Sequence, residues 1–244
     1  MSLPGARLIV GTLPAAGETA RLTAEESQHA RARRLRRGDP VVLVDGTGRE
    51  AAAVLTRLEG RGGEALVQRV LPAEDRTTRV ALLVCGLRAE RLAWLAQKAT
   101  ELEAESLTLV ASSRTQSFRA SAGTIERLER VCREAAKQSE ASRWPRIAGP
   151  LPLDRVLALE RTSHHLFLDA SGEPFPVVLA PRPALLLVGP EGGWTEEETE
   201  AACARQWSTV ALPAGRLRAE TAAVAALVLA RAALARGRAS DAAR

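Results

Sequence analysis

A glycine-rich string in the last third of the chain has the composition of a ligand-binding loop. It reads Gly189-Pro190-Glu191-Gly192-Gly193 and directly follows the apolar run Leu185–Val188. Glycines lack a Cβ atom, so the backbone N–H and C=O groups of such a loop can approach a ligand closely. Thr195 and Glu198 then form the pattern of a capping box, which predicts a helix start. In open α/β sheets, ligands bind at loops that lie between the carboxyl end of a strand and a helix.

A second string, Leu217–Ala222, carries side chains that could act on an acidic group of a substrate. Arg218 could stabilise an anion as a proton is lost, and Arg143 is a second candidate cation. Glu220 is a candidate general base. Glu220 and Thr221 also stand where they could cap a helix that starts near Thr221, and the pattern favours capping over catalysis for this pair.

Strands and helices that alternate after residue 79 could position these strings. Continuous apolar runs predict five strands, at Val80–Gly86, Leu107–Ala111, His165–Leu168, Leu185–Val188 and Thr209–Leu212. Apolar residues at helical spacing predict helices over Ala89–Leu102, around Ile125–Ala135 and over Ala222–Arg236. Gly237 would end the last helix, and Arg238–Arg244 would be frayed. This alternation predicts an α/β fold with a mainly parallel sheet flanked by helices.

The first 72 residues have a different pattern, which predicts a small β-barrel. Short apolar stretches are separated by turns rich in glycine, such as Asp45-Gly46-Thr47-Gly48. The polar segment Pro72–Arg79 is the predicted linker. We therefore predict two domains, over residues 1–72 and 73–244.

Composition narrows the class of protein. Of the 244 residues, 46% are hydrophobic, which is enough for a substantial core. No apolar run reaches the roughly 18 residues that span a bilayer, and no signal-peptide pattern precedes the first domain, so we expect a cytoplasmic protein without membrane contact. Cys85, Cys132 and Cys203 are far apart, and His164-His165 lacks partners at ligand spacing. We expect buried thiols and no metal site.

The charge of the chain favours a polyanionic partner. The net charge is +5 and the sequence pI is near 10.0. Five guanidinium groups fall within seven residues, at Arg31, Arg33, Arg34, Arg36 and Arg37. Such a cluster binds phosphates in nucleic-acid-binding proteins, and a solvated surface loop is the alternative reading.

The strings together resemble the RsmE family of 16S ribosomal RNA uridine-N3 methyltransferases, which belongs to the SPOUT class. The glycine string matches the family loop fully, with Trp194 in place of the usual phenylalanine. Trp94–Leu102 resembles the family's QKATELG helix, and Leu212–Ala222 resembles its LGxRILRxETA string. Weaker matches cover His29 with Arg34, Ser112–Thr115, and Glu134–Ser139 followed by Arg143.

The resemblance implies an N-terminal PUA-like β-barrel that contacts RNA and a C-terminal domain that binds S-adenosylmethionine in a trefoil knot. It implies methylation of uridine N3 in 16S rRNA of the small ribosomal subunit, by a homodimer. The implied cofactor contacts are Leu168, Asp169, Gly189, Pro190, Glu191, Gly192, Gly193, Leu212, Leu217, Arg218, Thr221 and Ala222. The implied RNA contacts are His29, Arg31, Arg33, Arg34, Arg36, Arg37 and Arg114.

Two other functions fit the same strings. A SPOUT methyltransferase could act on tRNA or on a ribose 2′-oxygen instead of uridine N3. A ribosome-assembly factor could bind RNA without methylating it, and departures from the family pattern at Ser113, Ala141 and Pro213–Gly215 keep this reading open.

Overall fold

The computed structural model describes residues 5–60, 62–72, 78–115, 121–160 and 162–242. The chain divides into two compact units, of which the first comprises Met1–Glu74 and Glu134–Trp144 and the second comprises Asp75–Arg133 and Pro145–Arg244. A division between residues 72 and 73 therefore leaves out the segment Glu134–Trp144, which the structure groups with the first unit. Residues 73–77 of the predicted linker lie outside the described residues.

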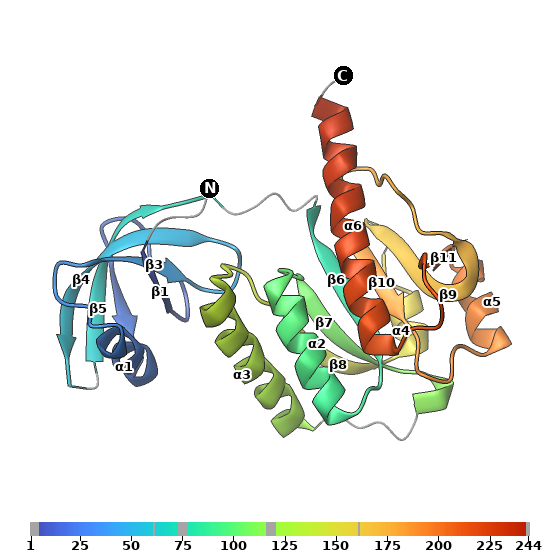
Figure 1. The fold of residues 1–244 in the computed structure, drawn as a ribbon, viewed down its shortest axis with the longest axis horizontal. Coiled ribbons are helices and arrows are strands. Elements are labelled where there is room, and N and C mark those ends of the chain that lie inside the picture. Colours follow the sequence, from blue (N-terminus) through green and yellow to red (C-terminus); the bar gives the residue numbers. More distant parts are fainter. Residues whose placement is uncertain (1–4, 61, 73–77, 116–120, 161, 243–244) are drawn as a thin grey trace. The chain divides into compact units, whose positions relative to one another are not determined.

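A curled five-stranded sheet forms the first unit (Figure 1). Its strand order is β1-β3-β4-β5-β2; β1 runs parallel to β3 and the other neighbours are antiparallel. The sequence analysis did not predict β2 or α1. The elements are β1 (Ala6–Ile9), β2 (Thr19–Leu22), α1 (Ala24–Ala32), β3 (Pro40–Val44), β4 (Glu50–Glu59) and β5 (Gly62–Val70).

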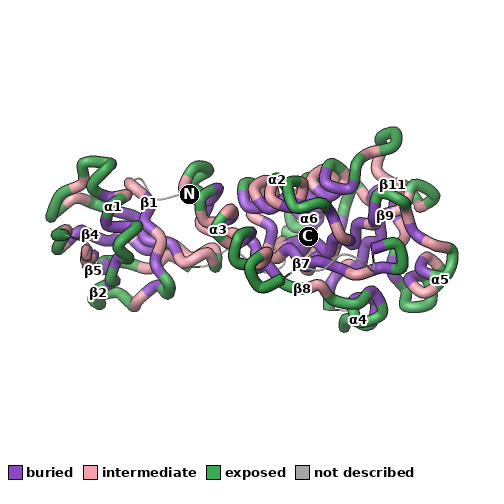
Figure 2. Tube along the Cα trace, turned by 90° about the horizontal axis from the view of Figure 1, so that it is seen from below, coloured by how far each residue is buried: buried purple, intermediate pink, exposed green. Residues whose placement is uncertain are grey.

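The core of the first unit follows from alternation along its strands. In β4, Ala51, Ala53 and Leu55 point inward, because successive side chains of a strand face opposite sides. They pack with Leu8 of β1 and Leu43 of β3. Figure 2 shows this buried interior in purple along the strands.

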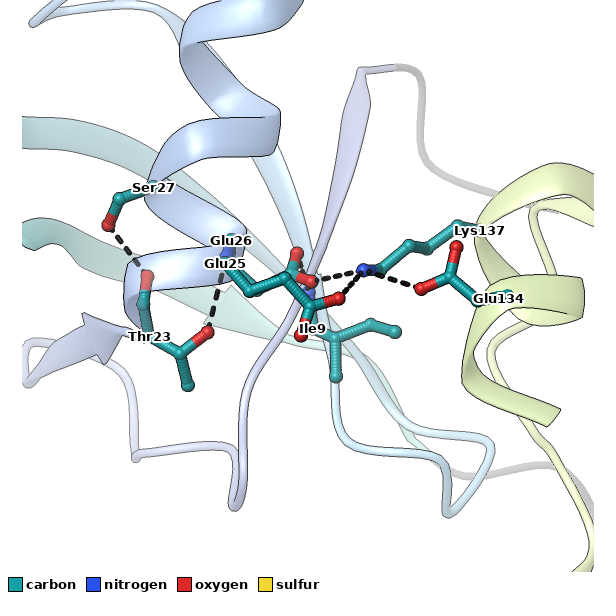
Figure 3. A network of polar contacts seen from close by, with 7 residues as sticks. All are labelled: Ile9, Thr23, Glu25, Glu26, Ser27, Glu134 and Lys137. Atoms are coloured by element: carbon teal, nitrogen blue, oxygen red, sulfur yellow. Dashed lines mark hydrogen bonds and ion pairs between the residues drawn. The ribbon is translucent and has the colours of Figure 1, made fainter. Parts of the chain in front are cut away.

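Lys137, on the part of α3 (Ala122–Ser139) that belongs to the first unit, lies among three carboxylates (Figure 3). Its Nζ is 2.7 Å from Glu25 Oε1, 2.8 Å from Glu26 Oε1 and 3.4 Å from Glu134 Oε1. Glu26 is 4% exposed, and its Oε2 accepts a hydrogen bond from the Ile9 N–H. Burial alone would lower the pKa of Lys137, but hydrogen bonds to Glu25 and Glu26 outweigh it and raise this pKa above the ordinary value.

The turn Asp45–Gly48 encloses the end of the segment Glu134–Trp144. The Gly48 N–H donates to the Ser142 carbonyl and the Trp144 N–H donates to the Gly46 carbonyl. Both glycines have positive φ, and a Cβ atom at Gly46 or Gly48 would clash with Trp144 or Arg143 respectively. The turn therefore needs glycine at both positions.

A six-stranded parallel sheet forms the second unit, with strand order β11-β9-β10-β6-β7-β8. The strands are β6 (Val80–Cys85), β7 (Ser106–Ala111), β8 (Arg146–Pro152), β9 (His164–Pro174), β10 (Ala184–Val188) and β11 (Ser208–Ala211). The helices are α2 (Ala89–Glu101), the part of α3 before Glu134, α4 (Leu153–Leu157), α5 (Glu196–Ala204) and α6 (Ala219–Ala242), with a short 3-10 turn at Ser113–Thr115. The predicted α/β class is confirmed.

Side chains leave the central strands toward opposite faces. Leu83 of β6 and Leu187 of β10 are register partners, and they pack in a cluster with Val156 of α4 and Ala202 of α5. Leu82 and its partner on β10 point to the other face, where α6 packs against both strands. The parallel sheet is thus covered on both faces, as its almost continuous apolar strands require.

The last helix differs from its prediction at the C-terminal end. Gly237 was expected to terminate it, yet α6 continues to Ala242. A Cβ atom at Gly237 would overlap the Leu179 carbonyl oxygen. The glycine therefore permits close packing of α6 against the segment before β10, and the predicted frayed tail is helical up to Ala242.

Candidate active site

A cavity of about 610 Å³ lies at the carboxyl ends of β10 and β11 and next to Leu168–Ala170 in the middle of β9, wholly within the second unit. Three segments line it: Leu168–Ala170, Val188–Trp194, and residues between Val210 and Ala222. The carboxyl edge of a parallel sheet is where open α/β folds bind ligands. The volume is within the range of small-molecule sites, roughly 300–1,000 Å³.

Most of the residues predicted to contact a cofactor line this cavity. They are Leu168, Asp169, Gly189, Pro190, Glu191, Gly192, Gly193, Leu212, Leu217 and Ala222. Arg218 and Thr221 are exposed and are not among the lining residues. The sequence analysis missed Ala170, Val188, Trp194, Val210, Ala214, Gly215, Arg216 and Ala219.

Trp194 explains why the glycine loop begins with glycine. Its indole Nε1 donates a 2.9 Å hydrogen bond to the Leu168 carbonyl, and its ring stacks on Phe167 with 4.5 Å between centroids. A Cβ atom at Gly189 would lie 2.7 Å from Trp194 Cε2, closer than atoms can approach. At the other end of the loop, Gly193 has φ +72°, which favours glycine.

Arg114 holds the far side of the glycine loop. Its guanidinium donates hydrogen bonds to the carbonyls of Gly192 and Gly193. The neighbouring Ser113 donates from its N–H and its Oγ to Glu198 Oε1, at 2.8 Å each. Glu198 also completes the predicted capping box with Thr195, which is confirmed. The structure thus places Arg114, predicted to bind RNA, in contact with the cavity wall.

Arg91, which the sequence analysis missed, connects the glycine loop with the first turn of α6. Its guanidinium pairs with Glu191, and its Nε lies 3.5 Å from Glu220 Oε1. Glu220 is 8% exposed, and its Oε2 accepts no hydrogen bond from the described residues. Glu220 thus faces a cation on α2, whereas the sequence pattern favoured helix capping for it. Its negative charge also suits the positive end of the helix dipole.

Asp169 lines the cavity but also shapes its own strand. Its Oδ1 accepts hydrogen bonds from the Ser171 N–H at 2.8 Å and from Ser171 Oγ at 2.6 Å. These hydrogen bonds lie just beyond Leu168, where the pairing of β9 with β10 ends. They hold the Asp169 carboxylate against its own strand.

Arg143 lies in the first unit, whereas the cavity belongs to the second. It is 4% exposed and is enclosed by the turn that contains Gly48. It does not line the cavity, and a catalytic role for Arg143 remains a prediction.

The residues predicted to bind RNA in the first unit lie at one end of α1. His29 and Arg31 are in its last turn, Arg33 is its C-cap, and Arg34 has φ 60°. Arg36 and Arg37 follow in the connection to β3. All five arginines of the cluster are exposed, and His29 is partly exposed. RNA binding by these residues remains a prediction.

The three cysteines are unpaired. Cys85 and Cys132 are buried as predicted, whereas Cys203 is exposed. Burial raises the pKa of the Cys85 thiol to about 12. In the described part of the chain, no group of three or more His, Cys, Asp or Glu side chains could hold a metal ion. The described helices include none that is long and apolar enough to cross a membrane.

Comparison with known proteins gives matches along most of the chain. Residues 74–231 match a family described as RNA methyltransferase domain, and residues 22–67 match one described as RNA methyltransferase PUA domain. The ribosomal RNA small subunit methyltransferase E of Mycobacterium tuberculosis is 33% identical, with 89% of this chain and 88% of the relative covered. The protein of that name from Synechocystis is 29% identical, with 91% and 75% covered.

Solved structures share the fold. The ribosomal RNA small subunit methyltransferase E of Neisseria gonorrhoeae, bound to S-adenosyl methionine, is 25% identical, has a TM-score of 0.80, and covers 92% of this chain and 96% of its own. A probable rRNA-methyltransferase from Porphyromonas gingivalis is 24% identical, has a TM-score of 0.78, and covers 94% and 98%. The predicted combination of a PUA-like sheet and a SPOUT-like parallel sheet is confirmed. The chain therefore belongs to the ribosomal RNA small subunit methyltransferase E family of RNA methyltransferases.

Proposed function

We propose that this protein transfers a methyl group from S-adenosylmethionine to N3 of a uridine in 16S rRNA of the small ribosomal subunit. The observation that carries this proposal is the cavity in which the glycine loop and the string Leu212–Ala222 come together with Leu168. The Neisseria gonorrhoeae relative, which has the same fold, was solved bound to S-adenosyl methionine. The choice of N3 rests on the family resemblance.

The residues of the cavity suit the parts of this cofactor. Backbone groups of Leu168, Gly189 and Leu212 offer donors and acceptors to the adenine and ribose, with little side-chain interference. Arg216 is the one arginine among the lining residues of this cavity. Its guanidinium suits the carboxylate of the methionine tail, because arginine binds carboxylates through paired hydrogen bonds.

When bound, S-adenosylmethionine supplies a methyl carbon that is open to attack because it is attached to a sulfonium. Uridine N3 gives up its proton to water, and its electron pair forms the bond to the methyl carbon as the carbon–sulfur bond breaks. The chain holds the two reactants in line. Arg218, exposed beside the cavity-lining Leu217, stabilises the negative charge that develops on the uridine.

Glu220 acts as a positioning residue in this proposal. It is buried and faces Arg91, which also pairs with Glu191 of the glycine loop. A carboxylate in this position is shielded from a substrate by its own cation. We therefore assign no proton transfer to Glu220.

We also propose that the protein works in the cytoplasm as a homodimer, with the first unit binding RNA. The homodimer follows from the family resemblance. Trp94 on α2 and Val228 on α6 are 42% and 46% exposed, and the two helices pack against each other. Large apolar side chains left on the surface are typical of protein interfaces.

Nucleoside mapping of 16S rRNA tests the proposal. In a strain without the gene, mass spectrometry should find one 3-methyluridine missing, and restoring the gene should restore the modification. Restoration of methyl on tRNA or on a ribose 2′-oxygen would replace the proposed substrate. Calorimetry should also detect S-adenosylmethionine binding to the purified protein, and an absence of both binding and modification would leave an RNA-binding assembly factor.

A further inference from the structure

A second cleft lies wholly in the first unit and has a volume of about 500 Å³. Four arginines line it: Arg31, Arg36, Arg37 and Arg57. Glu59 and Glu64 also line it, so the formal charge of the lining is +2. We call this feature the arginine cleft. Its charge favours an anionic ligand.

Two leucines form the apolar part of the lining of the arginine cleft, which we call its apolar floor. Leu35 and Leu58 line the cleft and are partly buried against the core of the first unit. Each therefore leaves part of its side chain open to a ligand. A phosphate ion gains nothing from contact with apolar side chains. The face of a nucleobase, in contrast, packs well on apolar side chains and on guanidinium planes.

Hydrogen bonds fix the loop that carries two of the arginines. Asp39 Oδ2 accepts a 2.7 Å hydrogen bond from the Arg36 N–H. The Gly38 N–H donates to the Leu55 carbonyl at 2.7 Å, which attaches the loop to β4. A loop held in this way loses little conformational freedom on binding, which favours affinity.

An ion pair on the sheet fixes the fourth arginine. Arg57 Nη2 lies 2.8 Å from Glu64 Oε1, across the β4–β5 pair. The hydrogen bond and positive charge of Arg57 lower the pKa of the Glu64 carboxyl. The ion pair thereby holds the Arg57 guanidinium in the lining of the cleft, where it can stack on a base.

We propose that the arginine cleft binds one unpaired nucleotide of the RNA substrate, with the base on Leu35 and Leu58 and the phosphate on Arg36 and Arg37. The inference rests on the proposed RNA methyltransferase function. It adds a nucleotide site separate from the uridine that is methylated, since the cleft and the cofactor cavity belong to different units. An acidic peptide would satisfy the arginines but not the floor.

Two exposed arginines elsewhere in the first unit provide a matched control. Arg21 and Arg69 are exposed, and they belong neither to the arginine cluster nor to the lining of the cleft. The test variant is Arg36→Gln with Arg37→Gln, and the control is Arg21→Gln with Arg69→Gln. Both remove two positive charges from the first unit.

Fluorescence anisotropy with a labelled single-stranded RNA decamer measures the difference, using the full chain. The test variant should bind about tenfold more weakly or worse, and the control should change less than threefold. Leu58→Ser should weaken binding of the decamer but not of an abasic decamer with the same backbone. Circular dichroism melting establishes that each variant is folded at the temperature of the assay.

Three results would overturn the site. Equal losses in the test and control variants would show only general attraction by charge. Equal effects of Leu58→Ser on normal and abasic RNA would remove the base from the floor, and tighter binding of a glutamate decamer than of RNA would make the cleft a peptide site. S-Adenosylmethionine affinity and 16S rRNA mapping report separately on the proposed function, so a failure there is distinguishable from a failure of the cleft.

Discussion

Arg91 Nε on α2 lies 3.5 Å from Oε1 of Glu220 on α6. The same guanidinium pairs with Glu191, so one side chain joins the glycine loop to the first turn of the last helix. Glu191 lines the cofactor cavity, and Glu220 directly follows the cavity-lining Ala219. The position of Arg91 therefore influences two walls of the cavity at once.

Removing this cation should destabilise the protein and loosen the cavity. Arg91→Leu leaves Glu220 buried without its counter-charge, which we expect to cost about 1–3 kcal/mol of unfolding free energy. The double variant Arg91→Leu/Glu220→Leu should recover part of that loss. Denaturant melts of the four proteins of this cycle measure the coupling, and strictly additive effects would show that the two side chains do not interact.

Gly189→Ala should weaken S-adenosylmethionine binding by displacing the Trp194 ring. The new methyl group would lie where Trp194 Cε2 approaches to 2.7 Å. A smaller ring should relieve the clash, so adding Trp194→Phe should restore part of the affinity. Calorimetric titration of Gly189→Ala and of the double variant tests this, with Gly11→Ala as control because nothing lies within 4 Å of a Cβ atom there. No rescue by phenylalanine would mean that Trp194 does not cause the defect.

Arg114→Ala should weaken cofactor binding more than RNA binding. It removes two hydrogen bonds to the carbonyls of Gly192 and Gly193, and we expect roughly tenfold lower affinity for S-adenosylmethionine. Arg127→Ala, an exposed arginine on α3, is the control for the lost charge. The reverse pattern, with normal cofactor affinity and weaker RNA binding, would support the role that the sequence suggested for Arg114.

Arg216 and Arg218 should have separable effects. Arg216→Gln should lower the affinity for S-adenosylmethionine by about tenfold, because the cavity loses its cation for the carboxylate of the methionine tail. Arg218→Ala should leave cofactor affinity unchanged and lower the turnover rate by roughly 10²–10³, the scale for losing one electrostatic donor at the transition state. Titration and single-turnover methylation measure the two quantities.

Each arginine has its own control. 5′-Methylthioadenosine lacks the amino-acid tail, so its affinity should not change in Arg216→Gln. Arg218→Lys should recover only part of the rate, because a point charge replaces a planar fork. A lower melting temperature or dimer fraction in Arg218→Ala, with normal methylation by the folded remainder, would contradict the catalytic role.

The two lysines of the chain offer a matched comparison of stability. Lys137→Met leaves Glu26 buried beside Glu25 and should lower the unfolding free energy by about 2–4 kcal/mol. Lys98→Met removes an exposed pair with Glu101 and should change it by less than about 1 kcal/mol. Equal losses would contradict the buried network.

The pH dependence of stability has a defined sign. Because the pKa of Lys137 is raised in the folded state, its contribution is complete below the ordinary lysine pKa and is lost as the pH rises through the folded value. The stability difference between wild type and Lys137→Met should therefore narrow only in strongly alkaline solution.

The sequence was sufficient where apolar residues run continuously or recur at helical spacing. The strands β6, β7 and β10 follow continuous apolar runs and the helix α2 follows helical spacing, and each was predicted near its observed bounds. Helix α1 was missed because its buried positions include Glu26 and Ser27, which carry no apolar signal. Polar groups that are buried and paired do not show in a hydrophobic pattern.

The residues of the site likewise fall into those that the sequence predicted and those that it did not. The glycine loop was predicted because its residues are consecutive in the sequence. Arg91 and Arg114 were placed at the glycine loop only by contacts between segments distant in sequence. The sequence did not show the turn that encloses Arg143, because that turn forms only in the folded first unit.

The first unit is built from two separate stretches of the chain, and this limits how its gene can be rearranged by recombination. A gene fragment that ends at residue 74 lacks Lys137, Arg143 and Trp144. Glu26 would then lose its buried cation, and the Gly46–Gly48 turn would lose the side chains that pack against it. A single recombination event could not move this unit intact into another protein. The two units should therefore be inherited together in one gene. Substitutions in Glu134–Trp144 should be correlated with substitutions in the N-terminal sheet.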